Sequence, residues 1–144
     1  MRRFGEAPQH DVRYTLRPGA YAILPRKGKL LLTHQSAPEP EFQLPGGGID
    51  PGEPVLPALH REILEETGWH VTDFKRLGAY RRFTFMPEYD LWAEKVCHIY
   101  VGRPTLKLGD PIETDHTAVW TTPDLAIELL ASDGDRAFLT QNLT

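Results

Sequence analysis

The chain has 144 residues, of which 40% are hydrophobic, so its length and composition suit one globular domain with a single substantial core. Sixteen basic residues against twenty acidic ones give a net charge of −4, which argues against a broad electrostatic footprint for nucleic acid or for an anionic membrane. A compact anionic ligand is still compatible with this balance, because a local site can be cationic or hold a metal ion. We therefore expect residues 1–144 to form one domain.

The cysteine content and the lengths of the apolar runs bear on the cellular compartment in which the protein is expected. The single cysteine, Cys97, cannot form an internal disulfide, and its flanks KVCHIYVG are typical of a partly buried strand, so a core thiol is expected rather than a nucleophile. No apolar run approaches the roughly 18 residues of a membrane helix. The N-terminal segment begins with two adjacent arginines, Arg2 and Arg3, but has no apolar stretch of a secretory signal behind them. These features predict a cytoplasmic protein that does not span a membrane.

The first third of the chain alternates between strand-like and loop-like segments. Residues 1–17 are polar and irregular apart from the short strand-like VRYTL, and we expect them to form a peripheral arm. In GAYAILPRKGKLLLTHQ, two apolar runs at 21–24 and 30–32 flank turn residues, which predicts a β-hairpin. The proline- and glycine-rich residues 36–53 are expected to be mostly loop, with a short strand at 42–44.

The following segment, up to Gly68, has the spacing of a helix. A stripe of mostly apolar residues, spaced three, four and four positions apart along the chain, would lie on one face of this helix. It consists of Leu56, Leu59, Ile63 and Thr67. If Pro54 is the N-cap residue, Pro57 lies in the first turn, where an amide donor would be unpaired in any case. Gly68 is the expected C-cap residue.

The last part of the chain predicts strands followed by helices. DFKRLGAYRRFTFM and LWAEKVCHIYVGR are expected to form an antiparallel pair joined by PEYD, and HTAVWTT is expected to be a further strand. Thr122 followed by Pro123 signals the start of a helix in DLAIELLAS. GDRAFLTQNL adds a last helical turn or two.

Three glutamates gather on the predicted helix before Gly68. Glu62 lies three residues before Glu65 and four before Glu66, so the carboxylates share one face. Each like-charge pair at this spacing destabilises the helix by about 0.2 to 0.5 kcal/mol. A bound cation would turn this repulsion into a net attraction. Carboxylate oxygens without cysteine or patterned histidine favour Mg²⁺ or Mn²⁺ over zinc. The alternative explanation is a solvated helix face, with Arg61 paired to Glu65.

The surroundings of these glutamates resemble the signature of a known family. The glycines of LPGGGIDPGE, just upstream, can expose main-chain groups to a ligand. Together with the helix, this stretch resembles the Nudix hydrolase box, G-x5-E-x7-R-E-U-x-E-E-x-G-U, in which U is a bulky apolar residue. Its specified positions are all filled, by Gly47, Glu53, Arg61, Glu62, Ile63, Glu65, Glu66, Gly68 and Trp69.

The resemblance implies a fold and a reaction. The fold is an α/β fold, the Nudix-type α/β/α sandwich with a mixed β-sheet between helices. The reaction is hydrolysis of the diphosphate linkage of a nucleoside diphosphate derivative, by attack of water on phosphorus in the presence of Mg²⁺ or Mn²⁺. Bridging cations would neutralise such a polyanionic substrate and position it.

The resemblance also implies roles for individual residues. By position, the metal is held by Glu62, Glu65, Glu66 and the main-chain carbonyl of Gly47. Arg61 and Glu53 are implied to form an ion pair that braces the loop against the helix. For the general base we favour Glu62, or a box glutamate acting through water, ahead of Glu113. The reserve candidates are Glu94, Asp115 and His116.

Substrate contacts are expected outside the box. Aromatic rings stack on bases and guanidinium groups bind phosphate, so the candidates lie on and around PEYD: Arg81, Arg82, Phe83, Phe85 and Tyr89. Strand alternation sends the two arginines to opposite faces, so only one of them is expected to reach the site. Phe83 and Phe85 share a face and are explained slightly better as core residues. LLTHQSA resembles the opening of the coenzyme A diphosphatase pattern, but Gln35 replaces its arginine, so we name no substrate.

Two functions fit the sequence. The first is a metal-dependent pyrophosphohydrolase that acts on a small nucleotide-type diphosphate. The second is a non-catalytic Nudix domain that binds a nucleotide metabolite as a sensor or interaction module. A pure binder has no need of all four glutamates of the box, which favours the enzyme. We expect neither a membrane nor an extended nucleic acid as partner, and a homodimer is compatible with the resemblance because dimers are common in the family.

Overall fold

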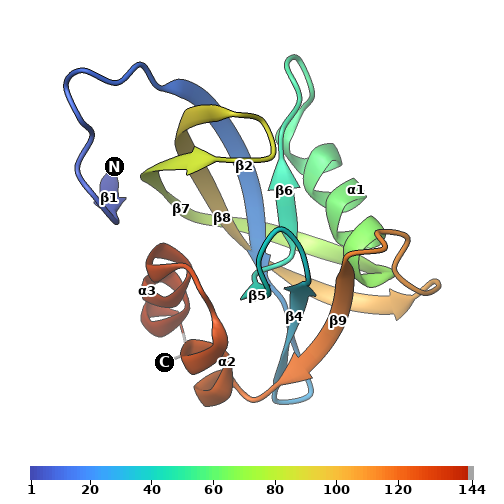
Figure 1. Cartoon of the computed structure of the whole chain (residues 1–144). Helices are drawn as coiled ribbons and strands as arrows, with labels where there is room; N and C mark the ends of the chain where they lie inside the picture. The colour runs from blue at the N-terminus through green and yellow to red at the C-terminus, as the bar shows by residue number, and fades with distance from the viewer. Residues whose placement is uncertain (143–144) are drawn as a thin grey trace.

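Two β-sheets lie between helices on opposite sides of the molecule (Figure 1). The computed structural model describes residues 1–142. Helix α1 (Val55–Thr67) covers one side, and helices α2 (Pro123–Leu129) and α3 (Asp133–Gln141) cover the other. The expected α/β/α sandwich is therefore confirmed.

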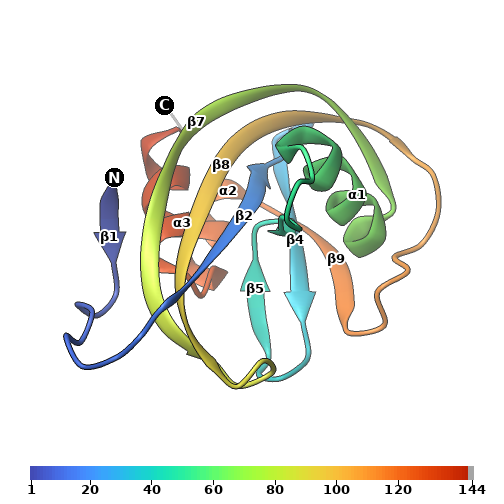
Figure 2. The same cartoon turned by 90° about the horizontal axis from the view of Figure 1, so that it is seen from above.

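The larger sheet is mixed and has five strands in the order β1-β7-β8-β2-β6. Their bounds are β1 (Arg2–Phe4), β2 (Thr15–Ile23), β6 (Gly46–Gly48), β7 (Trp69–Met86) and β8 (Leu91–Lys107). The pairs β1/β7 and β2/β8 are parallel, whereas β7/β8 and β2/β6 are antiparallel. Three register shifts between β7 and β8 coincide with the strong curvature that both strands show in Figure 2.

The smaller sheet is built around β4 (Lys29–Gln35). This strand pairs antiparallel with β3 (Pro25–Arg26), β5 (Glu41–Gln43) and β9 (His116–Thr121). The predicted hairpin is present, although its tight turn joins β4 to the short β3. The turn contains Lys27 and Gly28 at φ angles of 51° and 79°.

Helix α1 begins and ends where its sequence predicts. Pro54 is the N-cap residue in extended conformation, and the N–H of Gly68, at φ 78°, donates to the carbonyl of Leu64 at 2.9 Å. Leu59 and Ile63 are fully buried. Leu56, which we expected on the buried stripe, is 40% exposed, whereas Val55 and Ala58 of the same first turn pack toward the core.

Alternation along the central strands builds two cores, one under each helical layer. Under α1 lies a cluster of Ala20, Ala22, Leu24, Leu31, Leu59, Ile63, Val71 and Tyr100. Under α2 and α3 lies a cluster of Ile23, Leu30, Leu32, Leu44, Tyr80, Cys97, Ile99, Ala126, Leu130 and Leu139. Cys97 therefore belongs to a core, as its sequence context predicts. Within residues 1–142 no helix is long and apolar enough to cross a membrane.

The N-terminal segment is more regular than the predicted arm. Residues 2–4 pair in parallel with residues 80–82 of β7, and residues 15–17 belong to β2. The ring of Phe4 lies 5.3 Å, centroid to centroid, from that of Tyr80 in an edge-on contact. The prediction of an irregular segment was wrong for residues 2–4, because their pairing partners lie far away in the sequence. The strand-like VRYTL is confirmed in part, since Thr15 and Leu16 begin β2.

The end of α1 yields a stability prediction. A Cβ on residue 68 would lie 2.0 Å from the carbonyl oxygen of Gly109, in addition to the strain of a positive φ. We expect Gly68→Ala to lower the free energy of unfolding by at least about 2 kcal/mol in urea titrations. Gly28→Ala is the matched control, because its φ is 79° and no atom lies within 4 Å of its Cβ. The control should lose only about 1 kcal/mol, and equal losses would contradict the role of the Gly109 contact.

Candidate active site

The carboxylate of Glu62 lies directly against the main chain of Gly47. Gly47 is on β6, which pairs with residues 19–21 of β2, and α1 packs over this strand. A Cβ on residue 47 would lie 2.7 Å from the carboxyl carbon of Glu62. A side chain on residue 47 would therefore displace the carboxylate of Glu62 from its present position against the backbone.

Glu66 is the most buried member of the acidic group, with 5% of its surface exposed. Its Oε1 accepts the N–H of Gly46 at 3.0 Å, and its Oε2 lies 3.8 Å from Nδ1 of His116. Burial raises the pKa of Glu66 to about 9, the Gly46 hydrogen bond opposes this shift, and the nearby Glu62 and Glu113 add to it. Burial also raises the pKa of Glu62, against the effect of a neighbouring guanidinium.

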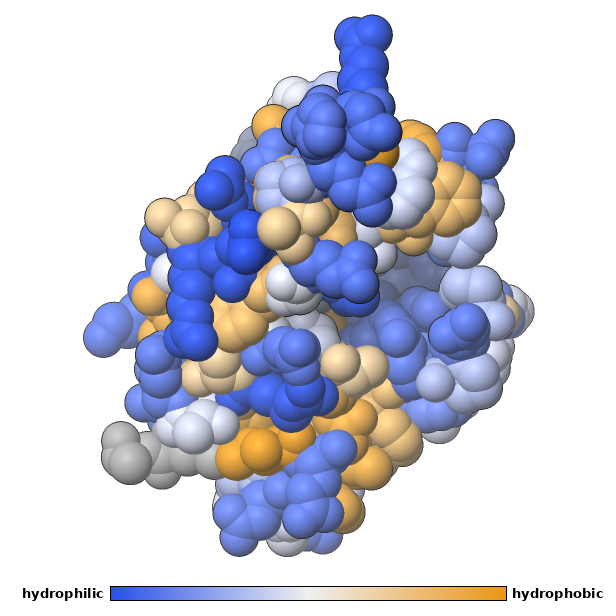
Figure 3. Space-filling view, turned by 60° about the vertical axis from the view of Figure 1, so that its left-hand side comes forward, coloured by the Kyte–Doolittle hydropathy of each residue, from blue (hydrophilic) through white to orange (hydrophobic). Residues whose placement is uncertain are grey.

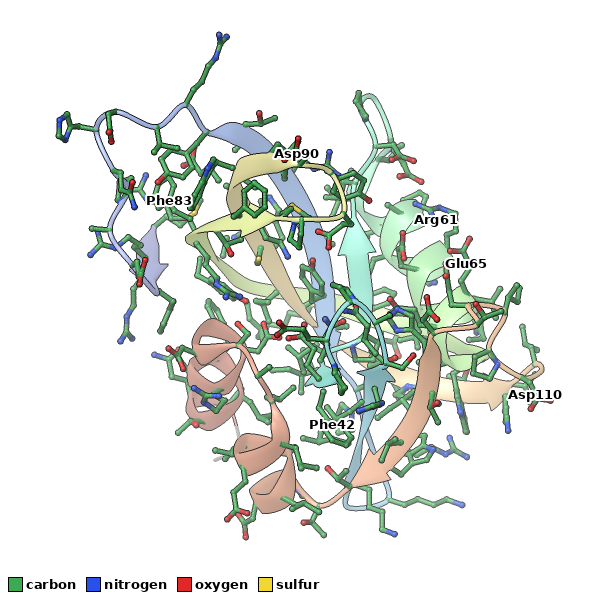
Figure 4. All side chains as sticks on the ribbon, viewed as in Figure 1. Phe42, Arg61, Glu65, Phe83, Asp90 and Asp110 are labelled. Carbon is green, nitrogen blue, oxygen red and sulfur yellow. The ribbon has the colours of Figure 1, made fainter. Side chains whose placement is uncertain are left out.

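That guanidinium belongs to Arg61, which holds the loop and the acidic face together. It donates to both carboxylate oxygens of Glu53 at 3.1 and 3.2 Å, so the expected ion pair is present. Its Nη1 also lies 3.1 Å from Glu62 and 3.5 Å from Glu65. Figure 4 shows Arg61 and Glu65 side by side along α1. The Glu53 bond raises the pKa of Arg61 and lowers that of Glu53, so both groups stay charged at neutral pH.

The acidic group fits a hard divalent cation in its chemistry. Among residues 1–142, no three His, Cys, Asp or Glu side chains converge closely enough to hold a metal ion as they stand. Arg61 draws Glu62 and Glu65 toward itself, while Glu66 is bonded to the main chain. The donors are nevertheless all carboxylate or carbonyl oxygens, and burial and mutual repulsion disfavour the charged forms of Glu62 and Glu66. A divalent cation would relieve that electrostatic cost.

A cavity of about 240 Å³ opens beside Glu62 and Glu66. Its opposite wall belongs to the sheet and to the start of α3, and it is formed by Tyr21, Tyr80, Arg82, Lys95, Cys97, Ser132 and Asp135. Figure 3 shows the molecular surface hollowed on one side, with mostly hydrophilic side chains around the hollow. The acidic box thus borders a polar cavity that can admit a substrate.

A buried polar cluster lines this cavity at the start of α3. The hydroxyl of Tyr80 donates to Oδ1 of Asp135 at 2.7 Å and lies 2.9 Å from Oγ of Ser132. Burial raises the pKa of Asp135 to about 6 and that of Cys97 to about 11, which keeps the thiol protonated. Sequence reasoning missed this cluster. Its one local signal is the Ser132-x-x-Asp135 spacing of a helix cap, in which Ser132 accepts the N–H of Asp135 at 3.3 Å.

A second, wider cavity of about 980 Å³ adjoins the first. Both cavities are lined by Gln35, Glu41, Gln43, Arg82 and Lys95, so they are continuous along this wall. Of the predicted substrate residues, Arg82 lines both and Tyr89 lines the second. Arg81 projects from the other face of β7, where it lies 3.7 Å from Glu94. One arginine of the pair reaches the cavities, in agreement with the alternation argument, and the reserve candidate Glu94 lies outside them.

The two phenylalanines of β7 have separate environments. Phe83 contacts the ring of Tyr14 at 4.9 Å between centroids, and Figure 4 places it beside the N-terminal segment, well away from Arg61. Phe85 is 40% exposed, packs at 5.3 Å on Trp92 and lines the second cavity. The core interpretation therefore suits Phe83 better than Phe85.

The loop between β8 and β9 brings further polar groups to the site. The N–H groups of Ile112 and Glu113 donate to the carbonyl of Glu65 at 2.8 and 3.1 Å, which fastens the loop to the end of α1. His116 lines the first cavity, with its Nδ1 2.9 Å from the buried hydroxyl of Thr33, and Asp115 lines the second. Glu113 is near enough to Glu62 and Glu66 to raise both of their pKa values.

Comparison with known proteins bears on the identity of this arrangement. The model of the NUDIX domain family matches residues 13–141. The chain belongs to the Nudix family. The Nudix chain is 38% identical over 74 residues to a Bacillus subtilis protein named "Putative 8-oxo-dGTP diphosphatase", covering 51% of this chain and 50% of that relative. It is 38% identical over 72 residues to the RNA pyrophosphohydrolase of Helicobacter pylori, covering 46% and 45%. The chain thus spans about half the length of these curated relatives.

Solved structures share the fold over most of the chain. A NUDIX hydrolase from Nitrosomonas europaea superposes with a TM-score of 0.70 at 18% identity, covering 88% of this chain and 87% of the other. A MutT NUDIX hydrolase from Burkholderia pseudomallei superposes with a TM-score of 0.68 at 26% identity, covering 89% and 98%. The sequence-based prediction of a Nudix fold is confirmed.

Glu66 yields a prediction on pH and stability. Because its pKa is raised to about 9 in the folded protein, folding favours the protonated form. Stability is therefore lost as the pH rises from the unfolded value near 4.5 toward 9, at up to about 1.4 kcal/mol per pH unit. Glu66→Gln does not titrate, so its advantage over the wild type in metal-free urea unfolding should be small at pH 5 and grow toward pH 8.

The exposed Glu128 of α2 provides the matched control for this prediction. Glu128→Gln should differ from the wild type by a nearly constant amount over the same pH range. A pH-independent difference for Glu66→Gln would show that Glu66 ionises normally.

Proposed function

We propose that this Nudix chain is a Mg²⁺- or Mn²⁺-dependent pyrophosphohydrolase that cleaves the diphosphate linkage of a nucleoside diphosphate derivative. The observation that carries this proposal is the complete box folded around a cavity, with Glu62 and Glu66 in its wall and Gly47 beside them. The names of the relatives, a diphosphatase and an RNA pyrophosphohydrolase, support an anhydride as the bond that is cleaved.

Glu62, Glu65, Glu66 and the carbonyl of Gly47 would hold the metal. When bound, a divalent ion neutralises the phosphate oxygens and makes water easier to deprotonate. The substrate diphosphate then lies in the first cavity against β6. A water oxygen forms a bond to one phosphorus while the bridging oxygen leaves with the other phosphoryl group.

Glu62 is the favoured proton acceptor in this reaction. It borders the cavity, and its raised pKa makes it a stronger base than an ordinary carboxylate near neutral pH. Arg61 holds one of its oxygens at 3.1 Å and so orients the carboxylate. Glu113 is the second candidate, because its loop is fastened to α1 and its charge acts on Glu62.

A substrate panel tests the proposed function. We expect the purified protein with Mg²⁺ or Mn²⁺ to release phosphate products from at least one of nucleoside triphosphates, nucleotide sugars, ADP-ribose, dinucleoside polyphosphates and coenzyme A. Removal of the metal with a chelator should abolish turnover, and its return should restore it. If metal binds and no member of the panel is hydrolysed, the chain is instead a Nudix domain that binds a nucleotide metabolite.

The roles of the glutamates are tested by isosteric variants. Glu65→Gln and Glu66→Gln should each weaken metal binding and lower kcat/KM at least about tenfold, because each removes one carboxylate of the metal site. Calorimetry with Mn²⁺ and steady-state kinetics measure the two effects. Glu128→Gln should match the wild type in both assays. Wild-type rates in both box variants would refute the metal assignment.

A further inference from the structure

Three cationic side chains form a row across the larger sheet. Arg17 of β2 is the register partner of Lys95 in β8, and Lys95 is the register partner of Arg82 in β7. Register partners point to the same face of a sheet, so the three side chains project together. Two residues along the same strands, Cys97 and Tyr80 line the first cavity, which places the row on the cavity face of the sheet.

The row forms no ion pair within the described part of the chain, although Lys95 and Arg82 lie near enough to the buried Asp135 to oppose the rise that burial causes in the pKa of its carboxyl group. Among residues 1–142, none of Arg17, Lys95 and Arg82 lies within 4.0 Å of a carboxylate oxygen in an ion pair. By contrast, Arg81 on the opposite face pairs with Glu94 at 3.7 Å. Like charges side by side on neighbouring strands repel one another. An anionic ligand would convert that repulsion into attraction.

Lys95 and Arg82 line the first cavity together with Glu62 and Glu66, but their strands lie farther across the sheet from β6. Arg17 lines neither cavity and meets the second one through its contact with the ring of Tyr89. The strand order places β6, which carries Gly47, next to β2, followed by β8 and β7. At about 4.8 Å per strand, Lys95 lies about 10 Å and Arg82 about 14 Å from β6 across the sheet. A diphosphate held against Gly47 and Glu62 therefore leaves the far end of the row free for a second anionic group.

The second cavity, which shares Lys95 and Arg82 with the first, suits the sugar and base of a nucleotide whose diphosphate lies at the box. Two exposed aromatic residues, Phe85 and Tyr89, line it, and the guanidinium of Arg17 lies 4.5 Å from the ring centroid of Tyr89. Aromatic surfaces of this kind stack on bases. The same cavity is also lined by four acidic residues, Glu39, Glu41, Glu88 and Asp115. These carboxylates accept hydrogen bonds from sugar hydroxyls and base amino groups, and they oppose a ligand that is anionic throughout.

We propose that Arg17, Lys95 and Arg82 form a second anion site for a phosphoryl group that the substrate carries beyond the diphosphate to be cleaved. The substrate class is a nucleotide with a 5′-polyphosphate at the box and a further phosphate or phosphodiester on the sugar, followed by at most a short extension into the second cavity. This assignment of the substrate rests on the proposed function. The net charge of −4 is consistent with a local site and not with an extended polyanion track.

Binding of a matched ligand pair tests the site without turnover. Adenosine 3′,5′-bisphosphate and adenosine 5′-monophosphate differ only in the second phosphate, and the other three ribonucleosides provide equivalent pairs. Calorimetry should show the bisphosphate binding about tenfold more tightly than the monophosphate for at least one base, as expected for hydrogen bonds to charged groups. The preference should decrease as the salt concentration is raised.

Variants of the row should remove this preference. Lys95→Met and Arg17→Gln should each reduce the affinity ratio of bisphosphate to monophosphate to below about threefold, with melting temperatures confirming the fold. Lys75→Met is the matched control, because Lys75 is an exposed lysine of β7 whose register partner is Val101 and not a member of the row, and it should keep the wild-type ratio. A ratio near one in the wild type, or an unchanged ratio in Lys95→Met, would overturn the proposal.

Hydrolysis assays separate this proposal from the function on which it rests. The substrates are a nucleoside 5′-triphosphate, its 3′-phosphorylated form and the corresponding 5′-triphosphorylated dinucleotide. If none is hydrolysed while the bisphosphate still binds more tightly, the anion site stands and the reaction fails. If all are hydrolysed with equal kcat/KM, the reaction stands and the anion site is refuted. A gain from the 3′-phosphate alone identifies a free bisphosphorylated nucleotide, and a gain confined to the dinucleotide identifies the 5′ end of a chain.

Discussion

The site depends on one contact, the approach of two glutamate side chains of α1 to the main chain of β6. Glu62 lies where a side chain on residue 47 would be, and Glu66 accepts the N–H of Gly46 in a nearly dry environment. Burying a carboxylate in this way is unfavourable unless it is hydrogen-bonded, neutralised or protonated. The raised pKa of Glu66 is the direct expression of that cost. The packing of a helix against a strand of glycines thus creates a cost that protonation relieves and that the metal ion of the proposed function would also offset.

The rest of the box holds this contact in place. Arg61 joins the loop residue Glu53 to the acidic face of the helix, so the end of the loop between β6 and α1 is fastened to the helix. Gly68 ends the helix close to the carbonyl of Gly109, and the N–H groups of residues 112 and 113 bond to the carbonyl of Glu65. The loop that carries Glu113 is thereby fastened to the same helix. Two loops distant in sequence are in this way fixed to one acidic helix.

Local patterns in the sequence were sufficient to predict α1 and the loop before it. The bounds of α1, its capping residues and the pairing of Arg61 with Glu53 all depend on residues fewer than about fifteen positions apart, and periodicity and motif spacing report such distances. The antiparallel pairing of β7 with β8 follows from one turn. The parallel pairing of β1 with β7 could not be predicted, because no local signal links residues 2–4 to residues 80–82. The exposure of Leu56 escaped prediction for a related reason, since helical spacing alone did not show that Val55 and Ala58, and not Leu56, face the core in the first turn.

The opposite wall of the cavity lay beyond sequence reasoning for the same physical reason. Tyr80, Lys95 and Asp135 come from two strands and a helix, and only the register of β7 with β8 and the packing of α3 bring them together. The molecule consequently separates two properties in space. Under the proposed function, the contact of α1 with β6 would determine which bond is broken, and the cavity face of β7 and β8 would determine which molecule is held there. A change of one cation in that face alters the electrostatic fit for a substrate without moving a carboxylate of the box, so a shared box is compatible with different substrates among chains of this fold.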